Sequence, residues 1–413
     1  MSRDRRLIVL GSGFGGFSLL RQLRHSGWEA TLVTPRNYFL FTPLLPSAVS
    51  GTVEFGSILE PVRQSLHGVR VVEAEAVGVD LAARRVDCVA GATRDRFTLE
   101  YDRLAIAVGA RSADYGIPGV REHALHLTSV EDARAIRLRI LECLAAAEVP
   151  SLDEAERCRR ASFVVCGGGP TGVEVAAEIH DLLREEARRA YPVATAHARV
   201  ALVEAGPKLL SGFDEELGAY AGEHFRRSGI EVLTSSPVRA VEAGRVVLAD
   251  GTEVPCGLVV WAAGNAPVEL LARLGWALDA HSRVPVDSFL RVRGAPGEAG
   301  VYALGDCAAC GEPALPATAQ VAQQQGKYLA IELRREARGA CPRPFRFRPF
   351  GMLAYIGEHE ALADLPRVKG GGRVTWLFWR SVYLTKLVSL ANKVKVGFDW
   401  VKAAVFGRDL SRF

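Results

Sequence analysis

Two stretches of the chain repeat one pattern of apolar, glycine-rich and again apolar positions. Residues 7–20 read LIVLGSGFGGFSLL, and residues 162–179 read SFVVCGGGPTGVEVAAEI. In each, a short unbroken apolar run ending at glycine predicts a buried strand, and the apolar positions that follow predict a helix. The pattern therefore predicts an α/β protein with two strand–turn–helix units of the Rossmann kind.

The glycines of both turns have the G-x-G-x-x-G spacing. The first two glycines allow a tight turn and close approach to a pyrophosphate, and the third allows helix and strand to pack closely. The phosphates then lie at the free N–H groups and positive dipole end of the helix. Two such turns, about 155 positions apart, predict two bound dinucleotides. The glycines that we assign to cofactor binding are Gly11, Gly13, Gly15 and Gly16 in the first turn and Gly167, Gly169 and Gly172 in the second.

The strands after the two units differ in the residue at their ends. RVALVEAG ends near Glu204, whose carboxylate can accept both ribose hydroxyls of an adenosine and would repel a 2′-phosphate. The second site is therefore expected to prefer NADH to NADPH. The strand after the first unit ends at Thr34 and Pro35 and has no acid.

Three further strand ends complete the domain prediction. LAIAVGAR and LVVWAAGN, with Gly109 and Gly264, are interpreted as crossovers between two nucleotide domains, and GVYALGDCA places Gly305 and Asp306 just after a buried strand. Asp306 suits a polyol hydroxyl such as the ribityl chain of a flavin, or else it caps the strand. We expect an FAD domain interrupted by an NADH domain. The expected ranges are 1–113 (FAD, first part), 114–266 (NADH), 267–330 (FAD, second part), 331–375 (quinone-site or interface segment) and 376–413 (membrane-anchoring helices).

The stretch NYFLFTPLLPSAVSGTV, residues 37–53, carries no charge and no cysteine. Disulfide reductases of this architecture need a thiol pair soon after the first unit, so this stretch argues against thiol relay chemistry and against sulfide oxidation. Its apolar side chains, with Pro43 among them, suit an apolar acceptor such as a quinone. Eight cysteines are scattered along the chain, and only Cys307 and Cys310 have redox or metal spacing. A structural role is favoured for this pair, and no metal site is expected.

These motifs resemble those of the type II NADH dehydrogenases (NADH:quinone oxidoreductases), a family of two-dinucleotide-binding flavoproteins. The resemblance covers essentially the whole chain through PRNYFLFTPLLPS, GGGPTGVE, GVYALGDCA, PATAQVAQQQGKYLA, GMLAYIG and FDWVKAAVFGRDL. It implies a respiratory-chain enzyme that passes two electrons from NADH through FAD to a membrane quinone without pumping protons. It also implies that Gln320 and Gln324 line the quinone site, with Gln320 beside the cofactor. Glu174 would lie near the nicotinamide and flavin, where it steers the amide group or relays protons. From the residues alone, the glutamines also fit a solvated helix face, and Glu174 fits a partner for the helix dipole.

The C-terminal tail combines a helical apolar stripe with excess positive charge. Residues 376–413 hold seven basic and two acidic side chains and so carry a net charge of +5, whereas the whole chain carries +4. The stripe predicts a helix that lies in a lipid interface, or alternatively a dimer helix or one that covers the core; Arg380 interrupts it and is expected to snorkel. Its members are Trp376, Trp379, Tyr383, Leu387, Leu390 and Val394, continued by Phe398, Val401 and Val405.

Further expectations concern a linker, the membrane and the binding partners. Residues 366–373, PRVKGGGR, are expected to form a linker. No run of eighteen uncharged, proline-free residues occurs, so no spanning helix is expected. Without a signal or transit segment, we expect a prokaryotic-type peripheral protein on the cytoplasmic face of the membrane. Its partners would be quinone, an anionic lipid surface and a second copy of the chain, with no nucleic acid. Two alternatives remain: an NADH-dependent reductase of a soluble acceptor, and an NADH-binding flavoprotein redox sensor without quinone turnover.

Overall fold

A computed structural model describes residues 5–24, 26–294 and 300–412 of the chain. The chain divides into two compact units. Unit 1 comprises Met1–Leu40, Glu60–Arg111 and Asn265–Pro349, and unit 2 comprises Phe41–Leu59, Ser112–Gly264 and Phe350–Phe413. The borders at 111 and 264 lie close to the expected domain limits at 113 and 266. The tail, which was expected to be a separate anchoring part, belongs to unit 2.

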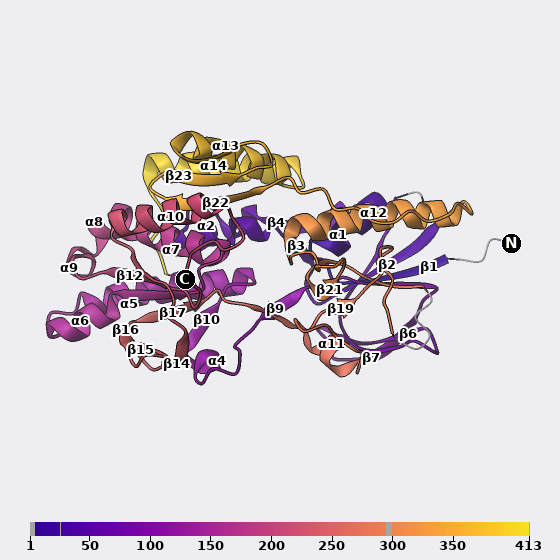
Figure 1. Cartoon of the computed structure of the whole chain (residues 1–413), viewed down its shortest axis with the longest axis horizontal. Helices are drawn as coiled ribbons and strands as arrows, with labels where there is room; N and C mark the ends of the chain where they lie inside the picture. Colours follow the sequence, from indigo (N-terminus) through magenta and orange to yellow (C-terminus); the bar gives the residue numbers. More distant parts are fainter. Residues whose placement is uncertain (1–4, 25, 295–299, 413) are drawn as a thin grey trace. The chain divides into compact units, whose positions relative to one another are not determined.

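Unit 1 is built on a seven-stranded sheet (Figure 1). Its first five strands are parallel, and an antiparallel meander of β5 (Arg70–Asp80), β6 (Arg85–Ala90) and β7 (Arg96–Glu100) extends one edge. Parallel strands covered by helices are buried on both faces, which explains the unbroken apolar run of β1. The predicted α/β class is confirmed. The sheet order is β20 (Val301–Ala303), β8 (Arg103–Ile106), β1 (Arg5–Leu10), β2 (Trp28–Thr34), β5 (Arg70–Asp80), β6 (Arg85–Ala90) and β7 (Arg96–Glu100).

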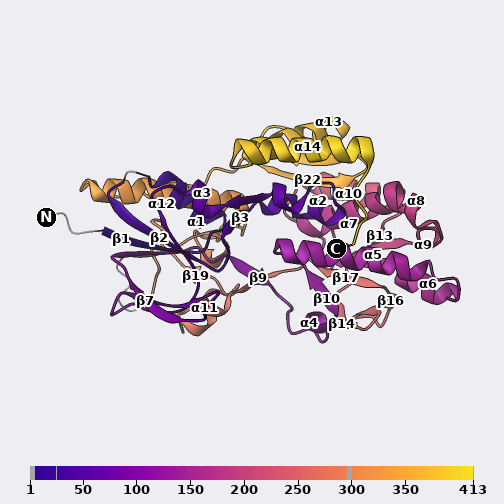
Figure 2. The same ribbon diagram turned by 180° about the vertical axis from the view of Figure 1, so that it is seen from behind.

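Helices α1 (Phe14–Gln22) and α12 (Ala319–Ala337) lie side by side in unit 1 (Figures 1 and 2). Their close approach depends on glycine: a Cβ at Gly326 would lie 2.2 Å from the backbone oxygen of Gly15. The Thr318 hydroxyl accepts from the N–H of Val321 and caps α12, as a helix beginning near Thr318 predicts. The smaller elements of unit 1 are β3 (Tyr38–Leu40), α3 (Val62–Ser65), β18 (Asn265–Pro267), α11 (Glu269–Arg273), β19 (Val284–Pro285), η4 (Gly305–Cys307) and β21 (Ala308–Ala309). Strands β4 (Leu59–Pro61) and β9 (Ala110–Ser112) span the borders between the units.

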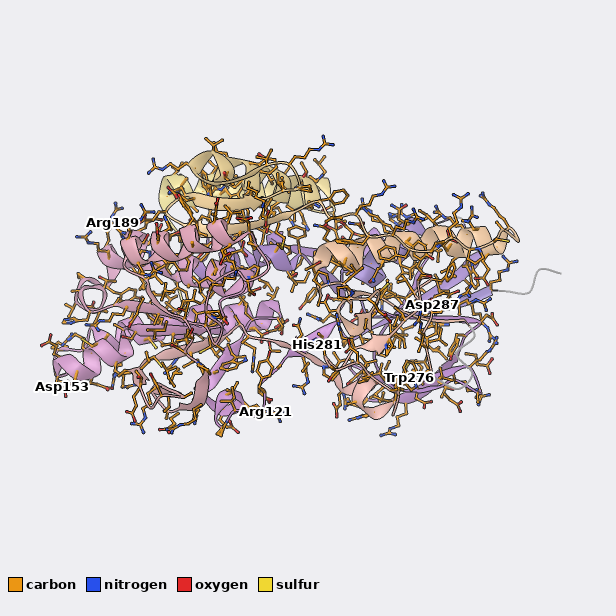
Figure 3. All side chains as sticks on the ribbon, viewed as in Figure 1. Arg121, Asp153, Arg189, Trp276, His281 and Asp287 are labelled. Carbon is orange, nitrogen blue, oxygen red and sulfur yellow. The ribbon has the colours of Figure 1, made fainter. Side chains whose placement is uncertain are left out.

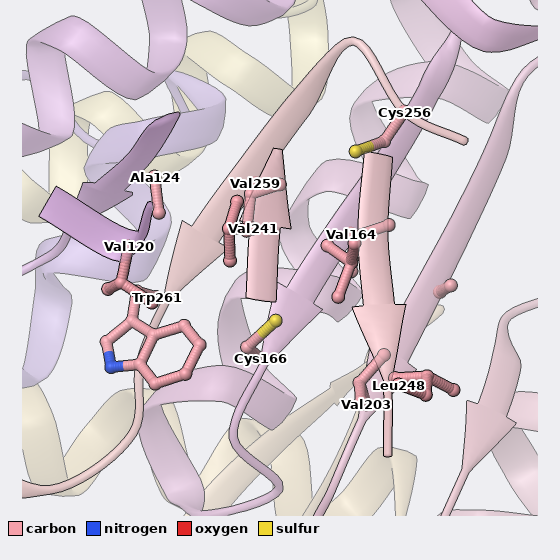
Figure 4. Packing of buried hydrophobic residues seen from close by; sticks show 12 residues of the cluster. Val120, Ala124, Val164, Cys166, Val203, Val241, Leu248, Cys256, Val259 and Trp261 are labelled. Atoms are coloured by element: carbon pink, nitrogen blue, oxygen red, sulfur yellow. The ribbon is translucent and has the colours of Figure 1, made fainter. Parts of the chain in front are cut away.

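Unit 2 contains a second parallel sheet of five strands. Helix α7 (Pro170–Leu182) follows its central strand, as the second glycine unit predicts, and continues into a π-helical turn, η3 (Leu183–Ala187). Cys166, Val259 and Trp261 belong to the apolar core that the sheet shares with a three-stranded antiparallel sheet (Figure 4). The parallel sheet runs β10 (Ala124–His126), β17 (Leu258–Trp261), β11 (Ser162–Cys166), β12 (Arg199–Val203) and β13 (Glu231–Leu233), and the antiparallel sheet runs β14 (Val238–Glu242), β15 (Arg245–Leu248) and β16 (Glu253–Pro255).

Helices α5 (Val130–Ala147) and α6 (Glu154–Arg160) of unit 2 begin at side-chain caps. Ser129 and Asp132 form a reciprocal capping box at the start of α5, and the Asp153 carboxylate caps α6 (Figure 3). Short polar side chains at these positions satisfy N–H groups that have no partner inside the helix. The other helices and helical turns of unit 2 before residue 350, apart from α7 and η3, are η1 (Thr42–Leu44), α2 (Leu45–Ser50), η2 (Phe55–Ser57), α4 (Val120–His123), α8 (Arg188–Ala190), α9 (Pro192–Ala196) and α10 (Glu215–Ser228).

The last part of unit 2 is a sheet of β22 (Met352–Gly357), β23 (Glu360–Asp364) and β24 (Lys369–Gly372), followed by α13 (Arg373–Lys386) and α14 (Leu390–Phe406). The expected linker at 366–373 is therefore wrong, because Lys369–Gly372 pairs with β23 as an antiparallel edge strand. Helix α13 packs on β22 and β23, and α14 lies beside α13 (Figures 1 and 2). Within the described part of the chain, every helix is too short or too polar to cross a membrane.

Candidate active site

The first glycine turn has the geometry that a pyrophosphate needs. Gly11 has φ +99°, and a Cβ there would lie 2.4 Å from the carbonyl oxygen of Ala107. A Cβ at Gly16 would lie 2.0 Å from the Gly11 oxygen, so this glycine lets α1 pack against the turn. A Cβ at Gly13, the N-cap of α1, would meet no atom within 4 Å, so space is open at the helix N-terminus. The turn therefore fits a dinucleotide held by backbone N–H groups.

At the end of β2, where the dinucleotide-binding fingerprint has an acidic residue, this chain has the hydroxyl of Thr34. Thr34 is buried, and its Oγ1 lies 3.0 Å from the Ser12 hydroxyl oxygen and donates to the carbonyl oxygen of Arg36. Ser12 also donates to the carbonyl oxygen of Tyr38. These bonds fix the backbone that follows β2 relative to the glycine turn without a negative charge.

Asp306 lies in η4, just after β20. The turn that carries Asp306 is fixed by Gln325, a residue that sequence analysis missed. The Gln325 side chain is 1% exposed, and its Oε1 accepts from the N–H of Gly305 at 2.7 Å. Gly305 has φ +78°, a conformation that a side chain would strain. Burial raises the pKa of the Asp306 carboxyl. Gln325 thus fixes the turn that carries Asp306, the proposed partner of the ribityl chain. The sequence feature that could have identified Gln325 was its position next to Gln324 on the helix.

The two candidate quinone residues lie one turn apart on α12. The Gln324 amide is used twice, because its Nε2 donates to the carbonyl oxygen of Arg348 at 2.8 Å and its Oε1 accepts from the N–H of Arg348 at 3.0 Å. Gln324 therefore holds the segment around Arg348, and a quinone oxygen would have to compete for the same amide. Gln320 lies one turn closer to the helix N-terminus and is half-buried.

The thiols of Cys307 and Cys310 are free, and both side chains are buried. Burial raises the pKa of Cys307 to about 11 and also raises the pKa of Cys310. A protonated, buried thiol is a poor nucleophile. This agrees with a structural role for the pair.

The second glycine turn lies in unit 2 and repeats the geometry of the first. Gly167 has φ +117°, and a Cβ at Gly172 would lie 1.8 Å from the Gly167 oxygen. Gly169 again faces open space at the N-terminus of the following helix, α7. Glu204, at the end of β12, accepts from the N–H groups of Gly168 and Gly206 through its two carboxylate oxygens. It is half-buried, so the carboxylate both fixes the turn and presents oxygen to a ribose.

Glu174 lies one turn into α7 and is buried. Its Oε1 accepts from the N–H of Tyr355 at 3.1 Å. Burial, aided by the neighbouring Glu178, raises the pKa of Glu174 to about 8. The side chain is therefore mostly protonated near neutral pH and can donate a proton.

The remaining predicted residues lie in both units. Pro43 is half-buried in η1, and the apolar stretch around it is packed into α2 against α5 and α7 of unit 2. Gly109 in unit 1 and Gly264 in unit 2 have φ +71° and +68°, as two strand-to-loop crossovers require. Unit 1 thus brings together the first glycine turn, Asp306 and Gln320, and unit 2 brings together the second glycine turn, Glu204 and Glu174.

Comparison with known proteins assigns both parts of the chain. Residues 5–326 match the pyridine nucleotide-disulphide oxidoreductase family, and residues 350–409 match the NDH2 C-terminal domain. A "Probable NADH dehydrogenase" of Dictyostelium discoideum is 38% identical over 99% of this chain and 92% of its own length. The mitochondrial "Internal alternative NAD(P)H-ubiquinone oxidoreductase A1" of Arabidopsis thaliana is 36% identical over 98% of this chain and 85% of its own length.

A solved structure extends the likeness to three dimensions. NDH2 from Plasmodium falciparum in complex with NADH superposes with a TM-score of 0.94 at 27% identity, covering 99% of this chain and all of the other. The predicted oxidoreductase activity and the cofactors FAD and NADH are confirmed. The chain belongs to the type II NADH dehydrogenases, the NADH:quinone oxidoreductases among the two-dinucleotide-binding flavoproteins.

Proposed function

We propose that this enzyme works as a peripheral protein on an anionic lipid surface, where it passes two electrons from NADH through FAD to a membrane quinone of the ubiquinone type. The Arabidopsis thaliana relative, which is named as a ubiquinone oxidoreductase, supports the acceptor. The observation that carries the lipid surface is the orientation of α14. We also propose that the enzyme lies on the cytoplasmic face, where it would meet soluble NADH.

Bound FAD supplies the redox chemistry, and the chain positions its partners and supplies protons. The first glycine turn and Asp306 would hold FAD, while the second glycine turn and Glu204 would hold NADH. We assign Gln320 and Gln324, one turn apart on α12, to the quinone carbonyls. Glu174 is the proposed proton donor, since it is buried and mostly protonated near neutral pH.

Helix α14 presents a row of apolar side chains outward, while its buried face carries polar side chains beside the apolar Val396 and Trp400. Asn392 donates to the carbonyl oxygen of Leu59, and Asp399 accepts from the N–H of Glu54, both on the buried face. The exposed apolar row is unusual for a helix that faces water, and it suits an apolar medium. The outward row consists of Leu390, Val394, Phe398, Val401 and Val405, which are 60–76% exposed.

The prediction that the apolar stripe of α13 faces lipid is wrong in part, because part of this stripe packs against the protein. Trp379 and Leu387 are only 3% exposed, whereas Leu377 and Phe378 are exposed on the outer side. Arg380 does not snorkel: its guanidinium stacks on the rings of Trp376 and Trp400, with ring centroids 3.9 and 4.7 Å away. Helical periodicity defines a stripe but not the partner that covers it.

Two basic side chains of the tail form salt bridges with acidic side chains of unit 2. Lys402 pairs with Glu54, and Arg408 pairs with Glu185 and Glu186. Fewer cations than the sequence suggested are therefore available to anionic lipid. We expect binding that is mainly apolar and only weakly sensitive to salt. The exposed apolar residues of α13 are the surface that we propose for a homodimer.

Vesicle flotation tests this proposal. Wild type should float with anionic vesicles, and Val394→Gln combined with Phe398→Gln and Val401→Gln should abolish flotation. The same variant should keep its activity with a soluble short-chain quinone and lose it with a long-chain quinone in vesicles. Ile331→Gln, an exposed apolar site on α12, is the matched control and should float normally. Equal flotation of wild type and the triple variant would refute the lipid surface.

A further inference from the structure

One exposed aromatic residue of unit 2 has a strained backbone. Tyr115, three residues after β9, has φ +52° and is 67% exposed. A bulky residue rarely adopts a positive φ, because its Cβ then crowds the backbone carbonyl oxygen. Such conformations persist where the surrounding structure holds them, and they are concentrated at sites that bind ligands. An exposed ring also gains little from burial within the chain, so packing explains neither feature of Tyr115.

Hydrogen bonds on both sides of Tyr115 hold its backbone in place. Trp261 is the last residue of β17, and its Nε1–H donates to the carbonyl oxygen of Ala113 at 2.8 Å. The Asp114 carboxylate accepts from the N–H of Gly116 at 3.0 Å. The strained residue is therefore fixed from the strand end on one side and from its own turn on the other, and it cannot relax without breaking these bonds.

The ring of Tyr115 lies over Gly264, just past the end of β17. A Cβ added at Gly264 would overlap the hydroxyl oxygen and Cζ of Tyr115, so the ring can lie there only over a glycine. Gly264 is itself exposed. The chain between β17 and Gly264 passes against the second glycine turn, since a Cβ at Gly167 would lie 2.8 Å from the carbonyl oxygen of Ala262. Tyr115 thus lies at a strand end that borders the turn assigned to NADH.

The order of the strands decides which half of NADH would reach Tyr115. Strand β11 leads into the second glycine turn and lies between β12 and β17 in the parallel sheet. In such a sheet a dinucleotide lies across the carboxyl ends of the strands, with its pyrophosphate at the helix N-terminus. Glu204, at the end of β12, is on the adenosine side. The nicotinamide half must then extend to the opposite side, over the end of β17, where Tyr115 lies.

We infer that Tyr115 binds the nicotinamide half of NADH, with its ring packed on the nicotinamide riboside and its hydroxyl hydrogen-bonded to it. The inference rests on the proposed function, in which the second glycine turn holds NADH. Aromatic rings stack on the planar bases of nucleotides, and a tyrosine hydroxyl both donates and accepts hydrogen bonds. The left-handed backbone directs the ring over the strand end, so this conformation serves binding and lowers stability.

A ligand that lacks the nicotinamide half tests this assignment. In titration calorimetry of the oxidised, FAD-loaded enzyme, Tyr115→Ala should raise the Kd of NAD⁺ about tenfold, because a stacking contact is lost. The Kd of ADP-ribose, which has no nicotinamide, should stay unchanged. Tyr115→Phe should raise the Kd of NAD⁺ less, since only the hydroxyl is removed. In stopped flow, Tyr115→Ala should need more NADH for half-maximal flavin reduction, while reoxidation of the flavin by quinone stays normal.

Thermal stability separates binding from a structural role of the ring. Tyr115→Gly removes the backbone strain together with the side chain, so it should melt at a higher temperature than Tyr115→Ala and bind NAD⁺ equally weakly. Ser282→Gly is the matched control, because Ser282 has φ +60° and belongs to unit 1. This control should melt at a higher temperature than wild type and bind NAD⁺ as wild type does.

Two results would overturn the inference: Tyr115→Ala that binds NAD⁺ as tightly as wild type, or Tyr115→Ala that loses affinity for NAD⁺ and ADP-ribose to the same extent. Glu204→Ala distinguishes this failure from a failure of the proposed function, because it should weaken the binding of both ligands. If Glu204→Ala changes neither Kd, the second glycine turn does not hold NADH, and the proposed function is contradicted instead.

Discussion

At the scale of single residues, burial decides what a side chain does. The sequence identified Glu174 through its motif, but its protonation depends on Tyr355 and Glu178 and on exclusion from water. Local motifs predicted the glycines and the acid at the end of β12 because the glycines act through their own backbone and Glu204 binds the backbone of the adjacent turn. They could not predict Gln325, because Gln320, Gln324 and Gln325 differ only in which side of α12 they occupy. They also could not show that the Gln324 amide is bound to Arg348.

Glu174 should make the stability of the protein depend on pH. Its folded pKa of about 8 lies above its ordinary value of 4.5, so the folded state holds a proton that the unfolded state has released. The free energy of unfolding should therefore fall as pH rises from about 4.5 through 8, with a contribution on the order of a few kcal/mol. Glu174→Gln should flatten this dependence in urea unfolding at pH 5.5, 7 and 9. An unchanged slope in the variant would show that Glu174 is not protonated in the folded protein.

No thiol should be needed for turnover. Cys307 stays protonated because its pKa is raised to about 11 by burial, and Cys310 is buried as well. The double variant Cys307→Ser, Cys310→Ser should keep most of its quinone reductase activity and all of its flavin. Cys341→Ser, at an exposed site, is the control for nonspecific effects. Total loss of activity with the flavin intact in the double variant alone would point back to thiol chemistry.

At the scale of elements, the sequence predicted what is local and missed what depends on neighbours. Both strand–turn–helix units are encoded in continuous segments, and both are confirmed. The glycine-rich segment Lys369–Gly372 looked like a linker, yet it forms a strand because β23 offers a free edge. The stripe of α13 was found at the right spacing, but Trp379 shows that it faces inward. A helix's period is local, while the identity of the surface that covers it is tertiary.

The crossing of α1 and α12 should depend on Gly326. A Cβ at this position would lie 2.2 Å from the backbone oxygen of Gly15, and neither backbone can move without shifting the first glycine turn. Gly326→Ala should lower the free energy of unfolding by about 1–3 kcal/mol and reduce the flavin retained on purification. Gly397→Ala is the matched control, because a Cβ within α14 would meet no atom within 4 Å and should raise helix stability slightly. Equal flavin content in both variants would contradict this account of the crossing.

At the scale of the whole molecule, compact units are assembled from segments that are far apart in sequence. Residues 41–59 and 350–413 join residues 112–264 in unit 2, an arrangement that the motif order did not predict. The tail is part of this unit, since Val396 and Trp400 are buried and Arg408 donates to the Thr52 hydroxyl at 2.9 Å. The tail helices therefore carry both the exposed row of apolar side chains and the side chains that pack into unit 2.

Truncation of the tail should therefore destabilise unit 2 rather than only release the protein from lipid. Ending the chain after Arg373 removes the buried Trp379 and Trp400, and it leaves Glu185 and Glu186 without Arg408. Loss of several buried aromatic and aliphatic side chains costs several kcal/mol, which should lower the melting temperature by on the order of 10 °C or more. Ending the chain after Asp409 keeps these contacts and should melt like wild type. A protein truncated after Arg373 with the wild-type melting temperature would mean that α13 and α14 are an independent anchor. If the expected loss is seen, lipid binding has to be tested with the outward-facing α14 substitutions, because only those leave the inner packing intact.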